Sequence, residues 1–168
     1  MMKHQPIGYL TTAALVAGLA ATVQAKTKTP MEVARTSSGP AAVISSTTTV
    51  PFGMKTVYIS GTTASPVNPA VPEDLGDTRV QTISVLTKIK AQLETMGMGM
   101  GDIVKMTVFL VAPTPGGRMD SAAMNDVFKT FFGTPEQPNK PARSTIQIAA
   151  LGRPTTYVEI EAVAAKVP

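Results

Sequence analysis

The residue types best suited to chemistry lie in two short segments near the C-terminus, 143–148 and 158–162. Both alternate polar and apolar side chains, as a β-strand does when one of its faces packs on a core. The polar positions are Arg143, Thr145, Gln147, Glu159 and Glu161. If the two strands are neighbours and their apolar residues face the core, the arginine and the carboxylates lie together on the opposite face.

An arginine beside carboxylates has two contrasting interpretations. The guanidinium group can bind a substrate carboxylate through two parallel hydrogen bonds, and a carboxylate side chain can activate a water molecule. The same pair across a sheet is also typical of a surface ion pair, which contributes little to stability. Spacing alone leaves both interpretations open.

The composition excludes several other kinds of chemistry. The chain has no cysteine, so it contains no disulfide, thiolate nucleophile or cysteine metal site. Its only histidine is His4, and its net charge of +4 is not concentrated in a basic helix or interleaved with aromatic residues, as nucleic-acid binding would require. We therefore expect no metal site and no nucleic-acid partner.

The N-terminus has the layout of a secretory signal peptide. Lys3 and His4 precede an apolar run from Tyr9 to Ala21, which is shorter than the ~20 residues that a membrane-spanning helix needs. A small-residue cleavage site ends at Ala25. We expect residues 1–25 to be removed, the protein to be periplasmic or secreted without a membrane anchor, and 26–37 to form a flexible lead-in.

Hydrophobic periodicity predicts an α+β domain with the element order ββ-α-β-α-ββ. Strands are expected at 43–50, 55–60, 103–111, 143–149 and 157–164, with the first two forming a hairpin. The first helix begins after Asp77, ends at Gly97 and presents Val80, Ile83, Leu86, Ile89, Leu93 and Met96. The second presents Met124, Val127, Phe128 and Phe131. Both helices are expected on one face of a single sheet, and the bare face favours an oligomer.

Two motifs in this domain resemble a known signature. Pro141-Ala142-Arg143-Ser144-Thr145 and Val158-Glu159-Ile160-Glu161-Ala162 resemble the C-terminal segments of the RidA/YjgF family of reactive-intermediate (enamine/imine) deaminases. Other segments resemble that family in the same order: Ser38-Gly39-Pro40, Ile59-Ser60-Gly61, Val67-Asn68-Pro69, Gln81-Thr82-Ile83, Gly101-Asp102-Ile103-Val104-Lys105, Asn125 and Phe131-Phe132. The resemblance defines a RidA-like domain at 38–168.

The resemblance implies a chorismate-mutase-like fold and a homotrimer with clefts between subunits. Its archetypal members hydrolyse enamines and imines of the 2-aminoacrylate type to 2-oxo acids and ammonia, without a cofactor. By the same resemblance, Arg143 binds the substrate carboxylate and Glu159 positions and activates the attacking water. Thr145, Ser60, Gly61 and Asn125 match positions that bind substrate or line the cleft.

The chain departs from the archetype at some positions. Ala41 stands where the archetype has a tyrosine that lines the site, Thr145 replaces a cysteine, and the loop from Val111 to Met119 is longer. The loss of the tyrosine favours an alternative function, a non-catalytic trimer that binds small carboxylate ligands. RNA cleavage, which is sometimes attributed to this family, is disfavoured because the exported chain lacks histidine, the usual acid–base residue near neutral pH.

Overall fold

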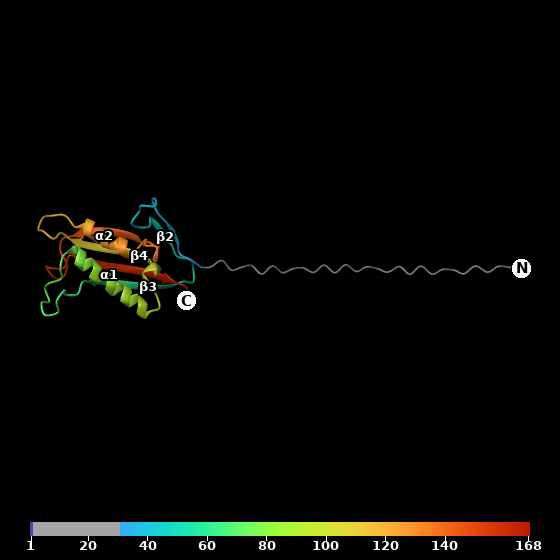
Figure 1. Cartoon of the computed structure of the whole chain (residues 1–168), viewed down its shortest axis with the longest axis horizontal. Coiled ribbons are helices and arrows are strands. Elements are labelled where there is room, and N and C mark those ends of the chain that lie inside the picture. Colours follow the sequence, from blue (N-terminus) through green and yellow to red (C-terminus); the bar gives the residue numbers. More distant parts are fainter. Residues whose placement is uncertain (2–30) are drawn as a thin grey trace. The chain divides into compact units, whose positions relative to one another are not determined.

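The computed structural model describes Met1 and residues 31–168 (Figure 1). The predicted signal peptide beyond Met1 and the first part of the predicted lead-in lie outside the described residues. No helix within the described part of the chain is long and apolar enough to cross a membrane.

The central sheet has four strands in the order β3-β6-β4-β5: Lys55–Thr63, Val158–Lys166, Ile103–Val111 and Ala142–Ile148. β6 runs antiparallel to β3 and to β4, whereas β4 and β5 are parallel. The two motif strands, β5 and β6, are therefore separated by β4 and are not neighbours. The expectation that they pair is wrong, because the buried β6 inserts between β3 and β4.

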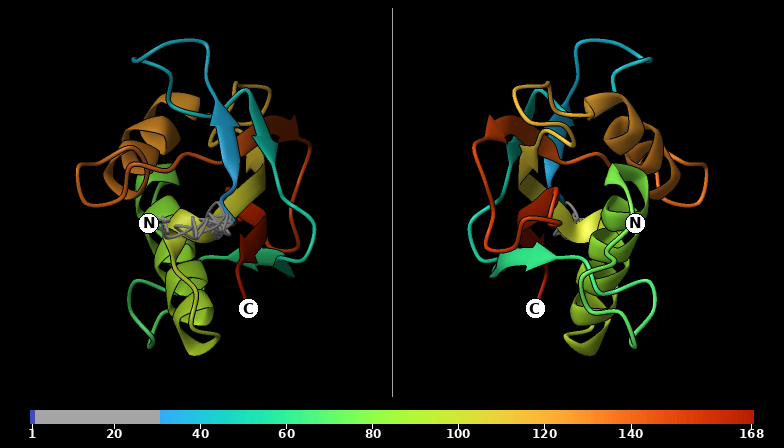
Figure 2. Two further views of the ribbon diagram at one scale, coloured as in Figure 1. Left: turned by 90° about the vertical axis from the view of Figure 1, so that its right-hand side faces the viewer. Right: turned by 90° about the vertical axis from the view of Figure 1, so that its left-hand side faces the viewer.

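Both helices cover the same face of this sheet, as predicted (Figure 2). Helix α1 spans Thr78–Thr95 and helix α2 spans Ser121–Phe131, and the short 3₁₀ helix η1 (Met100–Asp102) leads into β4. Asp77 caps α1 by accepting a hydrogen bond from the Val80 amide at 2.8 Å, and Asp120 caps α2 from the Ala123 amide at 3.0 Å. Helix–sheet packing leaves the other face of the sheet open.

The buried face of α1 differs from the predicted one near its start. Val80 and Ile83 are 40% and 46% exposed. The residues that pack inward are Thr78, Gln81, Thr82, Val85, Leu86, Ile89 and Leu93. The predicted apolar stripe is wrong there because polar residues occupy the first two turns of the buried face, where Gln81 and Thr82 donate hydrogen bonds to backbone carbonyls.

The N-terminal strands pair differently from the prediction. β2 (Thr47–Thr49) pairs antiparallel with β1 (Ala34–Thr36) and not with β3, so the predicted hairpin is wrong. β1 lies within the expected lead-in and is fixed there, since the Arg35 guanidinium donates to the carbonyl oxygens of Gly101 and Ile103 at 3.0 and 3.3 Å. The Thr48 hydroxyl donates to the Val104 carbonyl at 3.0 Å, which anchors β2 beside β4.

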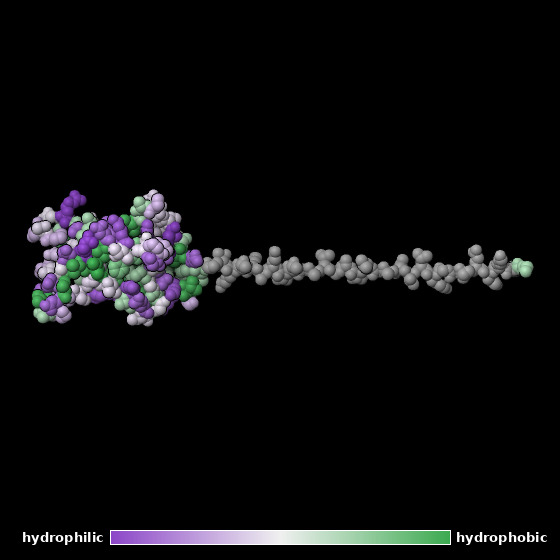
Figure 3. All heavy atoms as spheres, viewed as in Figure 1, coloured by the Kyte–Doolittle hydropathy of each residue, from purple (hydrophilic) through white to green (hydrophobic). Residues whose placement is uncertain are grey.

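The core lies between the helices and the sheet, and its largest fully buried side chains include Phe128, Leu86, Ile89 and Met106. On the helix side of the domain, hydrophilic and hydrophobic residues are mixed at the surface (Figure 3). On the open side of the sheet, Tyr58 is 80% exposed and Ile146 is 45% exposed. Large exposed apolar side chains on a sheet face favour coverage by another surface.

Candidate active site

Strand register places the predicted catalytic residues on opposite faces of the sheet. Arg143 and Thr145 of β5 lie beside Met106 and Val108, which are fully buried under the helices. Glu159 lies beside Phe109 on the other, open face. The prediction that the arginine and the carboxylate share one surface of the sheet is therefore wrong for a single chain.

Arg143 is held between β5 and α2 (Ser121–Phe131). Its Nη2 donates to Asn125 Oδ1 at 2.6 Å, its Nη1 contacts Met124 Sδ at 3.5 Å, and the guanidinium lies 4.3 Å from the centre of the Phe128 ring. Asn125 thus joins Arg143, as the resemblance implied. Burial lowers the pKa of Arg143 to about 10, so the side chain remains protonated at neutral pH.

The Arg143 cation has no acidic neighbour among the described residues. Within residues 31–168, no carboxylate forms an ion pair with Arg143, and its buried Nε has no hydrogen-bond partner. The hydroxyl of Thr145, two residues along the same face of β5, is also buried and without a partner in this part of the chain. A buried guanidinium with spare donors next to a spare hydroxyl is an arrangement suited to binding a small anion.

Glu159 has a different environment on β6. Its carboxylate packs on the backbone of Gly61, so closely that a Cβ atom on Gly61 would collide with Glu159 Oε1. The β3–β6 register shifts between Ile59 and Thr62, so Ser60 and Gly61 lie at an irregular point of the strand pairing. The structure therefore brings Gly61 and Glu159 together as a second group, separate from Arg143, Thr145 and Asn125. Ser60 lines a hollow of the open face together with Glu161.

Comparison with known proteins identifies the domain. The family model described as Endoribonuclease L-PSP matches residues 40–166. The chain belongs to the RidA/YjgF/L-PSP family. This result confirms the family predicted from the sequence motifs.

The RidA/YjgF/L-PSP relatives include named deaminases. A 2-iminobutanoate/2-iminopropanoate deaminase of Escherichia coli strain K12 is 37% identical over 101 residues, which are 60% of this chain and 73% of that protein. The structure of YyfB, a Rid-family protein of Yersinia pestis, has a TM-score of 0.59 at 28% identity. The match covers 73% of this chain and 86% of the YyfB chain. Escherichia coli TdcF with bound serine has a TM-score of 0.53 at 36% identity, with coverages of 70% and 84%.

Two features of this RidA/YjgF/L-PSP chain were not predicted from its sequence. Glu159 lines a pocket of about 630 Å³ that also includes Lys88 and Arg153. The pocket lies between the end of β3, the loop before α1, α1 itself and the turn from β5 to β6. The one sequence signal for Arg153 is Pro154 after it, whose restricted backbone angle favours a turn.

The second unpredicted feature is the hydrogen bonding of Gln81. Its side-chain amide is fully buried and donates to the carbonyl oxygens of Gly76 and Thr155 at 2.9 and 2.8 Å. Its Oε1 accepts from the amides of Tyr157 and Val158 at 2.7 and 3.3 Å. One satisfied side chain of α1 therefore fixes the chain entering β6, directly before Glu159.

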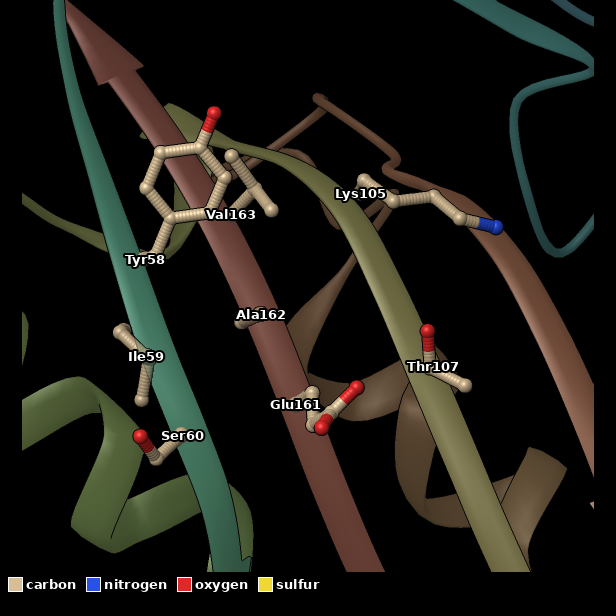
Figure 4. Close-up of a pocket in the computed structure, with 8 residues that line it drawn as sticks. All are labelled: Tyr58, Ile59, Ser60, Lys105, Thr107, Glu161, Ala162 and Val163. Carbon is tan, nitrogen blue, oxygen red and sulfur yellow. The ribbon is translucent and has the colours of Figure 1, made fainter.

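The other carboxylate of the motif, Glu161, lies apart from Glu159 on the open face. It lines a hollow of about 270 Å³ together with Tyr58 of β3 and with Lys105 and Thr107 of β4, the two strands that flank β6 (Figure 4). Lys105 Nζ donates to the Ser144 hydroxyl at 2.9 Å. Glu161 is therefore a neighbour of the exposed apolar residues on this face and does not contact the Arg143 group.

Proposed function

We propose that the protein is a cofactor-free hydrolytic deaminase that converts small enamines and imines of the 2-aminoacrylate type to 2-oxo acids and ammonia. The observation that carries this proposal is Arg143, a buried cation without an acidic partner in residues 31–168, beside the unpartnered Thr145 hydroxyl. Such a site suits the carboxylate of an imino acid. The relative named as a 2-iminobutanoate/2-iminopropanoate deaminase supports this reaction class.

The position of Glu159 adds a requirement to this proposal. Because Glu159 and Arg143 lie on opposite faces of one sheet, a site that uses both must combine two copies of the chain. A cyclic oligomer has interfaces that bring two different surfaces of the same protein together. We infer a homotrimer in which Arg143, Thr145 and Asn125 of one copy meet Glu159 and Gly61 of the next.

In this site each residue has a defined task. Arg143 binds the substrate carboxylate, while Asn125 and the Phe128 ring hold the guanidinium in place. Glu159 accepts a proton from water, whose oxygen attacks the imine carbon and forms a carbinolamine. Glu159 returns this proton to the nitrogen of the carbinolamine. It then takes the proton of the carbinolamine hydroxyl and transfers it to the same nitrogen, so that the carbonyl forms, the carbon–nitrogen bond breaks and ammonia leaves the 2-oxo acid. One water is consumed, and no oxidant or cofactor is needed.

The family description also contains a ribonuclease activity, which this site does not favour. The only histidine of the sequence is His4, far from the domain in the sequence, and the acid–base group proposed here is a single carboxylate. Arg143 is held between β5 and α2, which suits a small anion better than a polynucleotide backbone.

A non-catalytic role is the second candidate. The Arg143 group alone suffices to bind a small carboxylate, the chain has Ala41 where the archetype has a tyrosine, and the related TdcF has been solved with bound serine. This alternative predicts thermal stabilisation by small carboxylates without turnover. Glu159 would then be dispensable.

Complementation between two inactive variants tests the proposed site. Imines are generated in situ by an amino-acid oxidase, and semicarbazide traps the imine that remains. Arg143→Ala and Glu159→Gln should each abolish acceleration of imine loss. After coexpression at equal amounts, random cyclic assembly should restore about one quarter of the wild-type sites, since each restored site needs an intact Arg143 beside an intact Glu159.

The outcomes separate the candidates. Recovery in the mixture supports a catalytic site shared between copies. Activity of the wild type with no recovery in mixed oligomers would overturn the shared site. No acceleration by the wild type, together with carboxylate-dependent stabilisation, would replace the deaminase proposal with the binding protein.

A further inference from the structure

The pocket beside Glu159 contains two cations that the proposed reaction does not use. Of the residues that line it, Arg153 and Lys88 are basic and Glu159 is the one carboxylate. In the part of the chain from 31 to 168, neither Arg153 nor Lys88 takes part in an ion pair. The pocket therefore has an excess of positive charge, which attracts an anionic group.

Arg153 is held at this pocket by a fixed turn. The Thr156 amide donates to the Arg153 carbonyl at 3.0 Å, and Pro154 occupies the second position of this four-residue turn, where its restricted backbone angle is favourable. The carbonyl of Thr155 in the same turn is held by the buried Gln81 at 2.8 Å. Arg153 Nη1 contacts the Pro72 carbonyl at 3.5 Å, so the side chain extends from the turn to the loop before α1.

Lys88 completes the cationic part of the pocket from α1. Its Nζ donates to the Thr63 carbonyl at 2.8 Å, which places the charge near the end of β3 while leaving its other hydrogens available. The rest of the lining is mixed: it includes the apolar residues Ala64, Pro66 and Leu75 as well as the hydroxyl residues Thr63, Ser65 and Thr156. A ligand part that fits here has a short hydrocarbon chain and a terminal anion.

We propose that this pocket binds the distal carboxylate of a 2-imino dicarboxylate, with Arg153 and Lys88 as the residues that determine this specificity. The proposal rests on the proposed function, because it gives a binding site to the far end of the substrate whose 2-imino group is hydrolysed at Glu159. The α-carboxylate binds Arg143 of the neighbouring copy, and the distal carboxylate extends past Glu159 into the pocket. Water adds to C2, the carbon–nitrogen bond breaks, and the products are ammonia and a 2-oxo dicarboxylate.

A comparison of two imines tests this specificity. One amino-acid oxidase generates the imine of glutamate and another that of alanine, and the ratio of their kcat/KM values is measured with semicarbazide trapping. For the wild type we expect the ratio to favour the dicarboxylate. Removal of one charge-assisted contact should lower the ratio about 10-fold to 100-fold in Arg153→Ala and to a similar extent in Lys88→Met. Arg118→Ala, which removes an arginine outside the pocket, should leave the ratio unchanged.

A binding measurement separates failure of this inference from failure of the proposed function. The product analogues 2-oxoglutarate and 2-oxobutanoate are titrated calorimetrically into the wild type, Arg153→Ala and Arg143→Ala. Weaker binding of 2-oxoglutarate alone in Arg153→Ala supports the pocket, even if no imine is turned over and the deaminase proposal falls. Turnover of both imines with a ratio that is the same in wild type and Arg153→Ala would overturn the pocket and leave the deaminase in place.

Discussion

The Arg143 group on the helix side of β5 and the Glu159 group on the open side of β6 differ in charge and in the contacts that hold them in place. Arg143 is a cation taken out of water, steadied by Asn125 and the Phe128 ring, and left without a counter-charge from residues 31–168. Glu159 is an anion at an irregular strand pairing, placed by its contact with the Gly61 backbone. In the proposed reaction the first group binds the substrate carboxylate and the second activates the water, and the following changes separate the two contributions.

Neutralisation of Glu159 should have the largest effect. Glu159→Gln preserves the size of the side chain but removes the base, so kcat should fall about 10²-fold to 10⁴-fold. The binding of 2-oxobutanoate should change much less. Glu161→Gln on the same strand and the same face is the matched control, and an equal loss of kcat in that variant would contradict the assignment.

The second test moves the Glu159 carboxylate without replacing Glu159 itself. In Gly61→Ala the new methyl group would collide with Oε1 of the Glu159 carboxylate, so the carboxylate has to move. The misplaced base should lower kcat by about 10²-fold with little change in the substrate affinity set by Arg143. Gly99→Ala is the control because a methyl group at that position would meet nothing within 4 Å. Unchanged kcat in Gly61→Ala would show that Glu159 tolerates displacement.

Removal of the cation should affect binding and stability in opposite directions. Arg143→Met should weaken 2-oxobutanoate binding about 10-fold to 100-fold, as expected for a charged hydrogen-bonded contact. Because the buried charge has no acidic partner within residues 31–168, we expect the thermal midpoint at pH 7 to rise by about 2–4 °C. Arg79→Met, which breaks an exposed pair with Asp126, is the control. A lower midpoint in Arg143→Met would mean that the guanidinium contributes to stability through its packing.

The pH dependence of binding gives the smallest effect. Burial lowers the pKa of Arg143 to about 10, so the free site remains charged from pH 6 to about 9 and carboxylate affinity should be nearly constant there. Above about pH 10 the free site loses its proton, and affinity should fall by about 10-fold per pH unit. Calorimetric titration of 2-oxobutanoate, with Arg143→Met as the baseline, measures this decline. A decline centred near neutral pH would point to a different group.

The positions of the helices and strands were predicted better from the sequence than the face of each strand that packs on the helices. The helices, β4 at 103–111 and the family agree with the structure, because long periodic segments and motif order depend on local sequence. The predicted face of β5 is wrong because it requires Ile146 to be buried, although Ile146 is 45% exposed on the open side. A period-two pattern shows that two faces differ without showing which one packs on the helices.

The pairing of β2 and the position of β6 depend on contacts between distant segments. The Thr48 hydroxyl reaches the Val104 carbonyl, and Gln81 reaches the backbone at Thr155 and Tyr157. No local pattern encodes these partners, so neither the strand order nor the role of Gln81 followed from the sequence. The separation of Arg143, Thr145 and Asn125 from Glu159 and Gly61 was therefore not predicted from the sequence.

The placement of Arg143 and Glu159 on opposite faces also determines how activity should depend on protein concentration. If a working site needs two chains, the number of sites is set by an association equilibrium and not by the amount of folded chain. Activity per chain should then fall when the protein is diluted below its dissociation constant, while each separated chain remains folded. The amount of protein would then set a threshold for function, below which folded chains bind a small carboxylate but do not hydrolyse imines.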